Sequence, residues 1–405
     1  MRGWLDELPR PIIIPAAWWR WDVRRRRRKA QGRMSAVAVD AIAARRLFVD
    51  ISTLARTDAG TGIQRLVKVE LGRLVDDPPD GLQTQPVAAT RTRPYRMIGW
   101  PLEEAGSDVV PLSPVAGDHF LGLDLSAHII PRKLDEMMAW RRTGVRFTFV
   151  IYDMLPLLHP QWFSGKLVAA FRRWIRAVAI LADDVLCISP DVQRHFHDWM
   201  DGRYGLSRSD IPSQLMPISV DGWAGRLWSE AQVARAPALA DTGPYCLAVG
   251  TVEPRKGYGD LLTAFDRLWK AGEAMTLVIA GRPGWKTQAL QARLRRHAEW
   301  GRRLFWFDNA DDRMLGSLYA HCAAVLQPSL GEGLGLPLLE AVQAGKPVFA
   351  RGLPVYRDIG LADGTVHFFP EAARGDELAD YLADFIATLA AESGNLASEI
   401  SRDAD

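Results

Sequence analysis

The sequence predicts an α/β protein made of two doubly wound domains, each built on a parallel sheet. Apolar, strand-like runs alternate with segments of helical length along most of the chain, which is typical of parallel sheets. The chain has 405 residues, enough for two domains of ordinary size with a core each. We place the first domain at residues 35–224, a linker at 225–244 and the second domain at 245–390.

Residues 1–34 differ in composition from the rest of the chain. In "PIIIPAAWWRWDVRRRRRKA" three tryptophans precede a basic run from Arg24 to Lys29. No apolar stretch reaches the roughly 18 residues that span a bilayer, and the basic run follows the apolar one, unlike a signal peptide. Three interpretations stay open: a disordered basic leader, an over-long start with Met34 as the true beginning, or a segment whose residues 12–29 contact an anionic membrane surface.

In the first domain, "RLFVDISTLARTDAGTGIQRLVKVEL" predicts a strand, a long loop and a helix beginning near Gly62. The loop is too long, and lacks the third glycine, for a dinucleotide fingerprint. "RFTFVIYDMLPLLHP" predicts a strand that ends in Tyr152-Asp153. For the helix expected at residues 166–182, core packing is the commoner outcome and a membrane-facing role the alternative. Ser189 is expected to cap the helix that follows the next strand.

The second domain begins with "YCLAVGTVEPRKGYGDLLTAF", which predicts a strand at residues 245–249, a loop, and a helix from about Gly257. Arg255 and Lys256 lie in that loop, at the carboxyl end of the strand, where open α/β sheets bind their ligands. Arginine offers a planar fork to phosphate oxygens and lysine a point charge. The pair therefore indicates a phosphate site.

A second strand–loop–helix unit follows in "CAAVLQPSLGEGLGLPLLEAVQAGKPV". The pattern predicts a strand from Cys322 to Pro328, a glycine turn, and a helix from about Leu336. A helix N-terminus favours a phosphate group, so Glu332 beside it should point past that anion toward hydroxyl groups. Glu340, eight positions on, has the same capacity, because carboxylates accept paired hydrogen bonds from vicinal diols. Together these residues predict a sugar-nucleotide site.

The quoted motifs, with "TLVIAGRPGW" and "LFWFDNADDRMLGSLYAHCAAVLQPS" between them, resemble the donor half of retaining family-4 glycosyltransferases. The hallmark of that family, E-x7-E, is matched by Glu332 and Glu340. "TGIQR" in the first domain resembles a bacterial polysaccharide and mannosyltransferase branch. The resemblance covers roughly residues 45–370 and implies the GT-B fold, with two facing Rossmann-like domains and a cleft between them.

The resemblance also implies roles for individual residues. The catalytic residues would be Glu332, near the donor sugar's hydroxyls, Arg255 and Lys256, which neutralise the departing phosphate, and Asp153. For Asp153 two roles stay open, contact with a sugar and a turn or helix cap. The positions implied to bind the donor are Glu340 on the ribose, the backbone of Gly333, Leu334 and Gly335 on the diphosphate, Gly62 across the cleft, and Asp308 and Asn309 beside the base.

The implied activity is transfer of a hexose with retention of configuration, in surface polysaccharide synthesis. The donor would be a nucleotide-diphosphate sugar, GDP-mannose-like or carrying uridine or thymidine, and the acceptor a glycan or lipid-linked glycan. Two alternatives remain. One is a sugar-nucleotide epimerase of the same fold, and the other is a catalytically silent partner that binds the sugar nucleotide.

Charge, short motifs and cysteine content limit which cofactors and partners we expect for this protein. A formal charge of +2 gives no reason to expect nucleic acid. There is no CxxC or HExxH pattern, and the D-x-D at Asp403–Asp405 lies in a polar tail. We expect that tail, residues 391–405, to be loose. We therefore expect neither a metal nor another cofactor. Cys187, Cys246 and Cys322 lie in apolar runs, which predicts buried thiols without disulfides and a cytoplasmic protein. Peripheral attachment to the inner face of the plasma membrane stays open.

Overall fold

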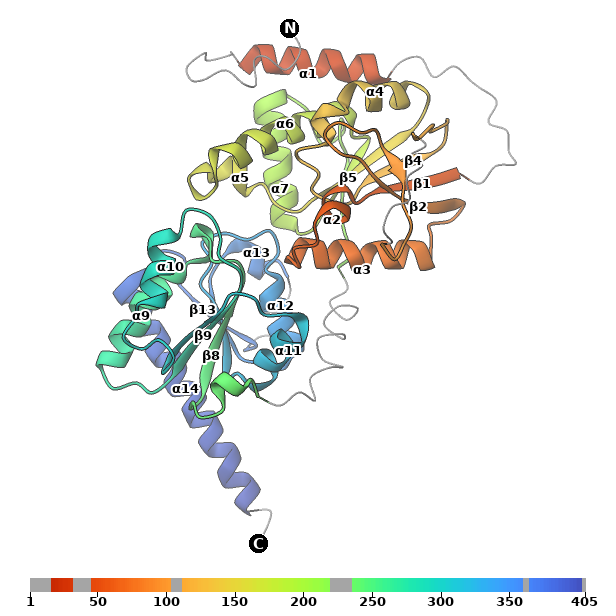
Figure 1. Cartoon of the computed structure of the whole chain (residues 1–405). Coiled ribbons are helices and arrows are strands. Elements are labelled where there is room, and N and C mark those ends of the chain that lie inside the picture. Colours follow the sequence, from red (N-terminus) through yellow and green to blue (C-terminus); the bar gives the residue numbers. More distant parts are fainter. Residues whose placement is uncertain (1–15, 32–44, 103–110, 219–234, 360–363, 403–405) are drawn as a thin grey trace. The chain divides into compact units, whose positions relative to one another are not determined.

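The computed structural model describes residues 16–31, 45–102, 111–218, 235–359 and 364–402. The chain divides into two compact units, and each contains a mostly parallel sheet flanked by helices (Figure 1). The first domain comprises residues 1–160 and 165–218, and the second comprises residues 161–164 and 219–405. Two α/β domains with parallel sheets are the fold that the sequence predicted.

The sheet of the first domain has the strand order β3-β2-β1-β4-β5-β6-β7. All its pairings are parallel except that of β2 with β3. The strands are β1 (Arg45–Asp50), β2 (Leu82–Ala88), β3 (Arg96–Met97), β4 (His119–Gly122), β5 (Arg146–Ile151), β6 (Asp184–Cys187) and β7 (Ser213–Leu215). The order reverses between β1 and β4, and such a reversal opens a crevice at the carboxyl ends of the strands.

Local signals explain where several helices of this domain begin. Thr61 and Gln64 form a capping box that starts α3 at Gly62. The Ser189 hydroxyl accepts from the Val192 amide at 3.2 Å and starts α7, as predicted. The helices are α1 (Ala16–Gln31), α2 (Ser52–Arg56), α3 (Gly62–Asp76), α4 (Leu134–Arg142), α5 (Leu155–Leu158), α6 (Gly165–Leu181) and α7 (Pro190–Trp199).

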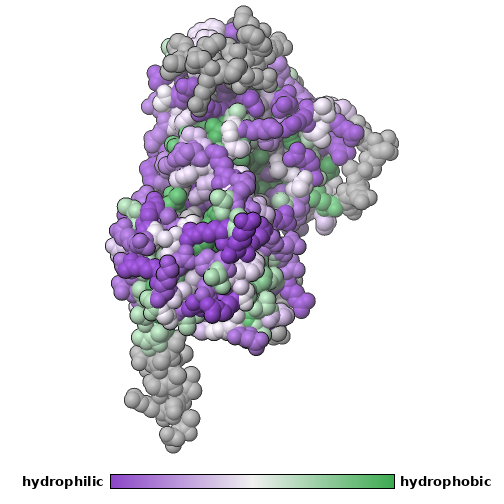
Figure 2. Space-filling model, turned by 60° about the vertical axis from the view of Figure 1, so that its left-hand side comes forward, coloured by the Kyte–Doolittle hydropathy of each residue, from purple (hydrophilic) through white to green (hydrophobic). Residues whose placement is uncertain are grey.

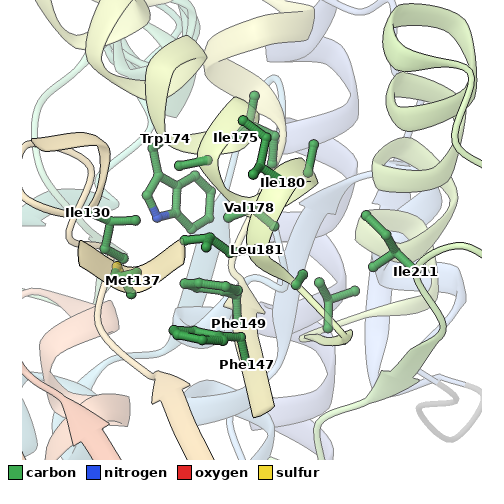
Figure 3. Close-up of a cluster of buried hydrophobic side chains, with 14 of the residues drawn as sticks. Ile130, Met137, Phe147, Phe149, Trp174, Ile175, Val178, Ile180, Leu181 and Ile211 are labelled. Carbon is green, nitrogen blue, oxygen red and sulfur yellow. The ribbon is translucent and has the colours of Figure 1, made fainter. Parts of the chain in front are cut away.

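Helix α6 forms the centre of the core of the first domain. Its buried side chains, Trp174 and Val178 among them, face Phe147 and Phe149 of β5 (Figure 3). The two phenylalanines are two residues apart on the strand, so they point to the same face of the sheet and stack with ring centroids 6.3 Å apart. Of the two roles left open for residues 166–182, the structure shows core packing.

The expectation that the basic leader stands apart from the first domain is wrong for residues 16–31. They form helix α1, which buries Trp19, Val23 and Ala30 in the core of the domain. Arg27, inside the basic run, donates to the carbonyls of Ala179, at 3.2 Å, and Ala182, at 2.7 Å. A cation at the C-terminus of α6 satisfies carbonyls that the helix itself leaves without donors. Residues 1–15 and 32–34 of the predicted leader lie outside the described residues.

The second domain has a six-stranded sheet in the order β10-β9-β8-β11-β12-β13, with every pairing parallel. Its strands are β8 (Tyr245–Val249), β9 (Thr276–Ala280), β10 (Leu304–Phe307), β11 (Ala324–Gln327), β12 (Val348–Arg351) and β13 (Val366–Phe369). Its helices are α9 (Tyr258–Lys270), α10 (Gln288–Arg295), α11 (Asp312–His321), α12 (Leu336–Gln343), α13 (Pro354–Arg357) and α14 (Gly375–Arg402). Here the strand order reverses between β8 and β11.

Two boundaries of this domain differ from the predicted ones. The described end of the predicted linker belongs to the domain, because Ala236 and Leu239 are buried in the same cluster as Tyr245. The predicted loose tail is helical as far as Arg402. It is the last part of α14, which extends beyond the rest of the second domain (Figure 1). Alanine, leucine and glutamate in that tail favour a helix, and one glycine is not enough to end it.

The three cysteines are buried and unpaired, as predicted. Burial raises the pKa of the Cys187 and Cys322 thiols to about 12, so neither ionises near neutral pH. Within the described residues, no helix combines the length and apolar character that crossing a bilayer requires. Figure 2 shows one face of the molecule, on which hydrophilic and hydrophobic side chains interleave.

Candidate active site

The predicted phosphate-binding and sugar-binding motifs lie on neighbouring loops of the second domain. Strands β8 and β11 pair with each other, and their carboxyl ends lead into the loops 250–257 and 328–335. The Leu330 amide donates to the Arg255 carbonyl at 2.7 Å, which joins the two loops. The strand order reverses between these two strands, so the pair occupies the place where doubly wound sheets bind ligands.

Two glycines permit this close packing. Gly257 has a φ of +70°, and a Cβ there would lie 2.3 Å from the Pro328 carbonyl oxygen. Gly335 caps helix α12 with a φ of +87°, and a Cβ there would lie 2.3 Å from the ring of Tyr356. Because any larger residue would collide at either position, the glycines fix how the loops approach each other.

Four charged side chains meet between these loops. Glu332 binds both predicted cations: its Oε2 lies 2.6 Å from Arg255 Nη1, and its Oε1 lies 2.6 Å from Lys256 Nζ. Arg255 Nε also lies 2.7 Å from Glu253 Oε1. The Arg255 side chain is 18% exposed and the Glu332 side chain 7%. The cluster balances two positive charges with two negative ones, and Arg255 is the cation more open to a ligand.

The neighbouring cations decide the ionisation of Glu332. Burial acts to raise the pKa of its carboxyl, but the charges of Arg255 and Lys256 outweigh that effect and lower the pKa to about 2. Gln327 Nε2 also lies 3.3 Å from Glu332 Oε1. Glu332 is therefore an anion at neutral pH that accepts hydrogen bonds and has no proton to donate.

Glu340 lies on the inner side of α12 and is buried. The hydroxyl of Tyr319, from α11, donates to Glu340 Oε2 and also contacts the Pro337 carbonyl at 3.4 Å. The structure thus gives Glu340 a fixed orientation, held by a buried tyrosine that the sequence analysis did not single out.

The other predicted donor residues fall into two groups. Gly333 and Leu334 are buried in the loop that leads to α12. Asp308 and Asn309 follow β10, an edge strand that β9 separates from β8. Both are exposed, and Asp308 pairs with Arg295 at 3.0 Å. The structure therefore keeps the loop residues beside Glu332 but places Asp308 and Asn309 after β10, three strands from β11 along the sheet edge.

Gly62 and Asp153 belong to the first domain. Gly62 is the first residue of α3, after the capping Thr61. Asp153 follows β5, and its Oδ1 accepts from the Leu155 amide at 3.1 Å where α5 begins. The structure shows the turn role that had been left open for Asp153, and its contact with a sugar stays a prediction.

Sequence reasoning missed several neighbours of Glu332. Glu253 had a visible signal, because it stands two positions before Arg255 in the same loop. Ser329 and Tyr356 had none. Their hydroxyls are buried and within electrostatic reach of Glu332, yet neither makes a hydrogen bond of good geometry with the described residues. They leave polar capacity beside the carboxylate for a bound ligand.

The described residues contain no group of three or more histidine, cysteine or acidic side chains placed to hold a metal ion. Metal independence stays a prediction. The positive charge that the site offers to an anion comes from Arg255 and Lys256, which the structure holds side by side.

The carboxyl edge of this parallel sheet therefore carries an Arg–Lys–Glu cluster that has the charges to bind an anion such as a phosphate. Residues 230–393 match the protein-family model described as "Glycosyl transferases group 1". This match covers most of the second domain, which is similar to the group 1 glycosyl transferases.

Curated proteins that match parts of the chain agree with this similarity. The chain is 34% identical to the serotype-specific mannosyltransferase WbdA of Escherichia coli over 328 residues, which cover 78% of this chain and 40% of WbdA. It is 36% identical over 107 residues to the O-antigen chain mannosyltransferase B of the same organism, covering 26% and 27% of the two chains. The chain thus spans about two fifths of the length of WbdA.

Among solved structures, HepE of Anabaena in complex with UDP-glucose has the same fold. The TM-score is 0.56 at 14% sequence identity, and the match covers 87% of this chain and 94% of HepE. This likeness shows the GT-B architecture that the sequence predicted.

Proposed function

We propose that the chain is a retaining glycosyltransferase that moves a hexose from a nucleotide-diphosphate sugar to a glycan or lipid-linked glycan in surface polysaccharide synthesis. The observation that carries the proposal is the Arg255–Lys256–Glu332 cluster at the switch point of the second sheet. The likeness to WbdA and to an O-antigen chain mannosyltransferase favours mannose as the sugar and O-antigen-type polysaccharide as the product.

In this proposal the donor diphosphate binds to the cations that Glu332 holds in the free protein. Arg255 offers its planar guanidinium to the phosphate oxygens, and Lys256 adds a second charge. Glu332, always ionised, then accepts hydrogen bonds from hydroxyls of the donor sugar. Glu340, oriented by Tyr319, accepts them from the ribose. Backbone N–H groups of the Gly333–Gly335 loop supply further donors to the diphosphate.

The transfer step that we propose is the front-face one that the resemblance to retaining glycosyltransferases implies. The acceptor oxygen forms a bond to the anomeric carbon while the bond from that carbon to the phosphate oxygen breaks. The acceptor proton passes to the departing phosphate, which lies on the attacked face, so the configuration is retained. Arg255 and Lys256 stabilise the negative charge that develops on the leaving group. Since they supply two positive charges, we expect transfer to proceed without a divalent ion.

The experiment is an assay with purified protein, a panel of sugar nucleotides and a glycolipid extract as acceptor, in the presence of EDTA. We expect incorporation from one donor, GDP-mannose first among them, and an NMR coupling pattern in the product that matches the donor's anomeric configuration. Conversion of the donor to its epimer without acceptor would instead support the epimerase. Donor binding without turnover on any acceptor would support the silent partner.

A further inference from the structure

The arginine run of α1 is divided between two faces of the helix. Arg20 and Arg24 point toward the turn after α7, where they donate to the carbonyls of Gly202, at 3.1 Å, and Gly205. Arg27 is buried against the end of α6. All three arginines make hydrogen bonds within the first domain, and Arg27 is buried, whereas Arg20 and Arg24 remain exposed.

The side of α1 that faces away from the domain core carries Trp21, Arg25, Arg28 and Lys29, at spacings of four, seven and eight residues from Trp21. We call this set the outer face of α1. All four side chains are exposed, Trp21 at 52%, and the Arg25 guanidinium lies 5.1 Å from the centre of the Trp21 ring system. None of the three cations has an ion-pair partner within the described part of the chain.

The one acidic residue of α1 does not reduce the charge of the outer face. Asp22 is buried, and its oxygens already bind Arg176 at 2.6 Å and Arg26 at 3.1 Å. The outer face is therefore a stripe of three uncompensated positive charges that ends in an exposed indole.

We propose that the outer face of α1 binds the surface of a bilayer that contains anionic phospholipid. Cations on a surface helix are attracted to anionic headgroups, and tryptophan prefers the headgroup layer because its ring is apolar and its N–H polar. Within the described residues 16–29, the proposal assigns lipid contact to the four side chains of the outer face. A nucleic acid would use the same charges but offers less to an indole at the end of the stripe.

The packing of α1 predicts the mode of binding. A free amphipathic helix inserts its apolar face into the bilayer, but Trp19 and Val23 of α1 are already buried in the protein. Attachment through the outer face is therefore mainly electrostatic, reversible and weakened by salt. The proposal needs no glycosyl transfer, and its test reads lipid binding alone, so it fails or holds separately from the proposed function.

The test is sedimentation of the full chain with vesicles of phosphatidylcholine alone or with one third phosphatidylglycerol. We expect binding only to the anionic vesicles and release in about 0.5 M salt, where screening is short-ranged. The triple variant Arg25→Gln, Arg28→Gln, Lys29→Gln should partition about 100-fold more weakly, since each cation near a charged surface contributes about fivefold. Trp21→Ala should weaken binding severalfold with every charge kept.

The control removes three charges elsewhere, at the exposed Lys270, Arg296 and Arg313 of the second domain, each changed to glutamine. It should bind the anionic vesicles as the unaltered chain does. The proposal is overturned if the α1 triple variant binds equally well, if neutral vesicles bind as much protein, or if the control loses as much affinity. Retention of a short DNA duplex without vesicle binding would assign the face to nucleic acid instead.

Discussion

At the scale of single residues, the candidate site depends on how Arg255 and Lys256 share Glu332. Each carboxylate oxygen of Glu332 binds one cation at 2.6 Å, and Arg255 is held in addition by Glu253. Removing one member would leave a nearly buried charge without its partner, which is costly in a low-dielectric environment. The four side chains therefore depend on one another for their charge balance.

Changing Glu332 or Arg255 to alanine should lower turnover at least a hundredfold, roughly the 3 kcal/mol of one key electrostatic contact. The measurement is kcat/KM in the transfer assay described above. Glu299→Gln provides the matched control, because Glu299 is a carboxylate of the same domain that pairs with Arg302 and Arg303 away from the site. Turnover like that of the unaltered chain in Glu332→Ala would contradict the assignment.

Asp50, at the end of β1, predicts a pH dependence of stability. Its carboxyl is buried, accepts from the Ser52 amide at 3.0 Å and the Tyr95 hydroxyl at 3.1 Å, and has its pKa raised to about 7 by burial. Between about pH 4 and 7 the unfolded chain loses this proton while the folded chain keeps it. Rising pH therefore destabilises the fold by about 1.4 kcal/mol per pH unit through this group.

Asp50→Asn removes that titration. The free energy of unfolding of the first domain, measured with urea at several pH values, should fall less steeply for the variant between pH 4 and 7. Identical slopes for both proteins would show that Asp50 does not hold its proton in the folded state.

At the scale of elements, α1 depends on one buried arginine. Burial and the nearby charge of Arg141 lower the pKa of Arg27 to about 10, so it remains a cation at neutral pH. Arg27→Met would leave the carbonyls of Ala179 and Ala182 without this donor. We expect the free energy of unfolding to fall by about 2–4 kcal/mol and the melting temperature to drop by several degrees.

Arg28→Met is the comparison, because Arg28 is the next residue along and points outward from the domain. Thermal unfolding should show no more than a small change for it. If both variants melt at the same temperature, the contact between α1 and the end of α6 does not stabilise the domain.

Elements were predicted best where the signal was local. Strand, glycine loop and helix around Glu332 follow from proline, glycine and apolar runs within some twenty residues. The helical state of residues 16–31 was missed because a block of arginines looks like a solvated charge run, and the carbonyls that satisfy Arg27 lie some 150 residues further along the chain. Tyr356 was missed because its position beside Gly335 is a tertiary contact.

At the scale of the whole molecule, both domains place functional candidates at the same point of their sheets. The strand order reverses at β8 and β11 in the second domain and at β1 and β4 in the first. The loops that carry Arg255 and Glu332 follow β8 and β11, the two strands at the reversal in the second domain. The loop that leads to Gly62 follows β1, at the reversal in the first domain. The parallel α/β domains followed from the alternation of elements and the GT-B fold from the motif resemblance, whereas the sugar and acceptor depend on side-chain geometry that no motif encodes.

The most direct test of the central claim is a thermal-shift panel with guanosine, uridine, thymidine and adenosine diphosphates in EDTA. A ligand that binds only the folded state stabilises it by about 2.7 kcal/mol at a hundred times its Kd. We predict a shift of several degrees with one of the four, and its loss in Arg255→Ala. No shift with any nucleotide, or an equal shift in the variant, would contradict a donor site built on Arg255, Lys256 and Glu332.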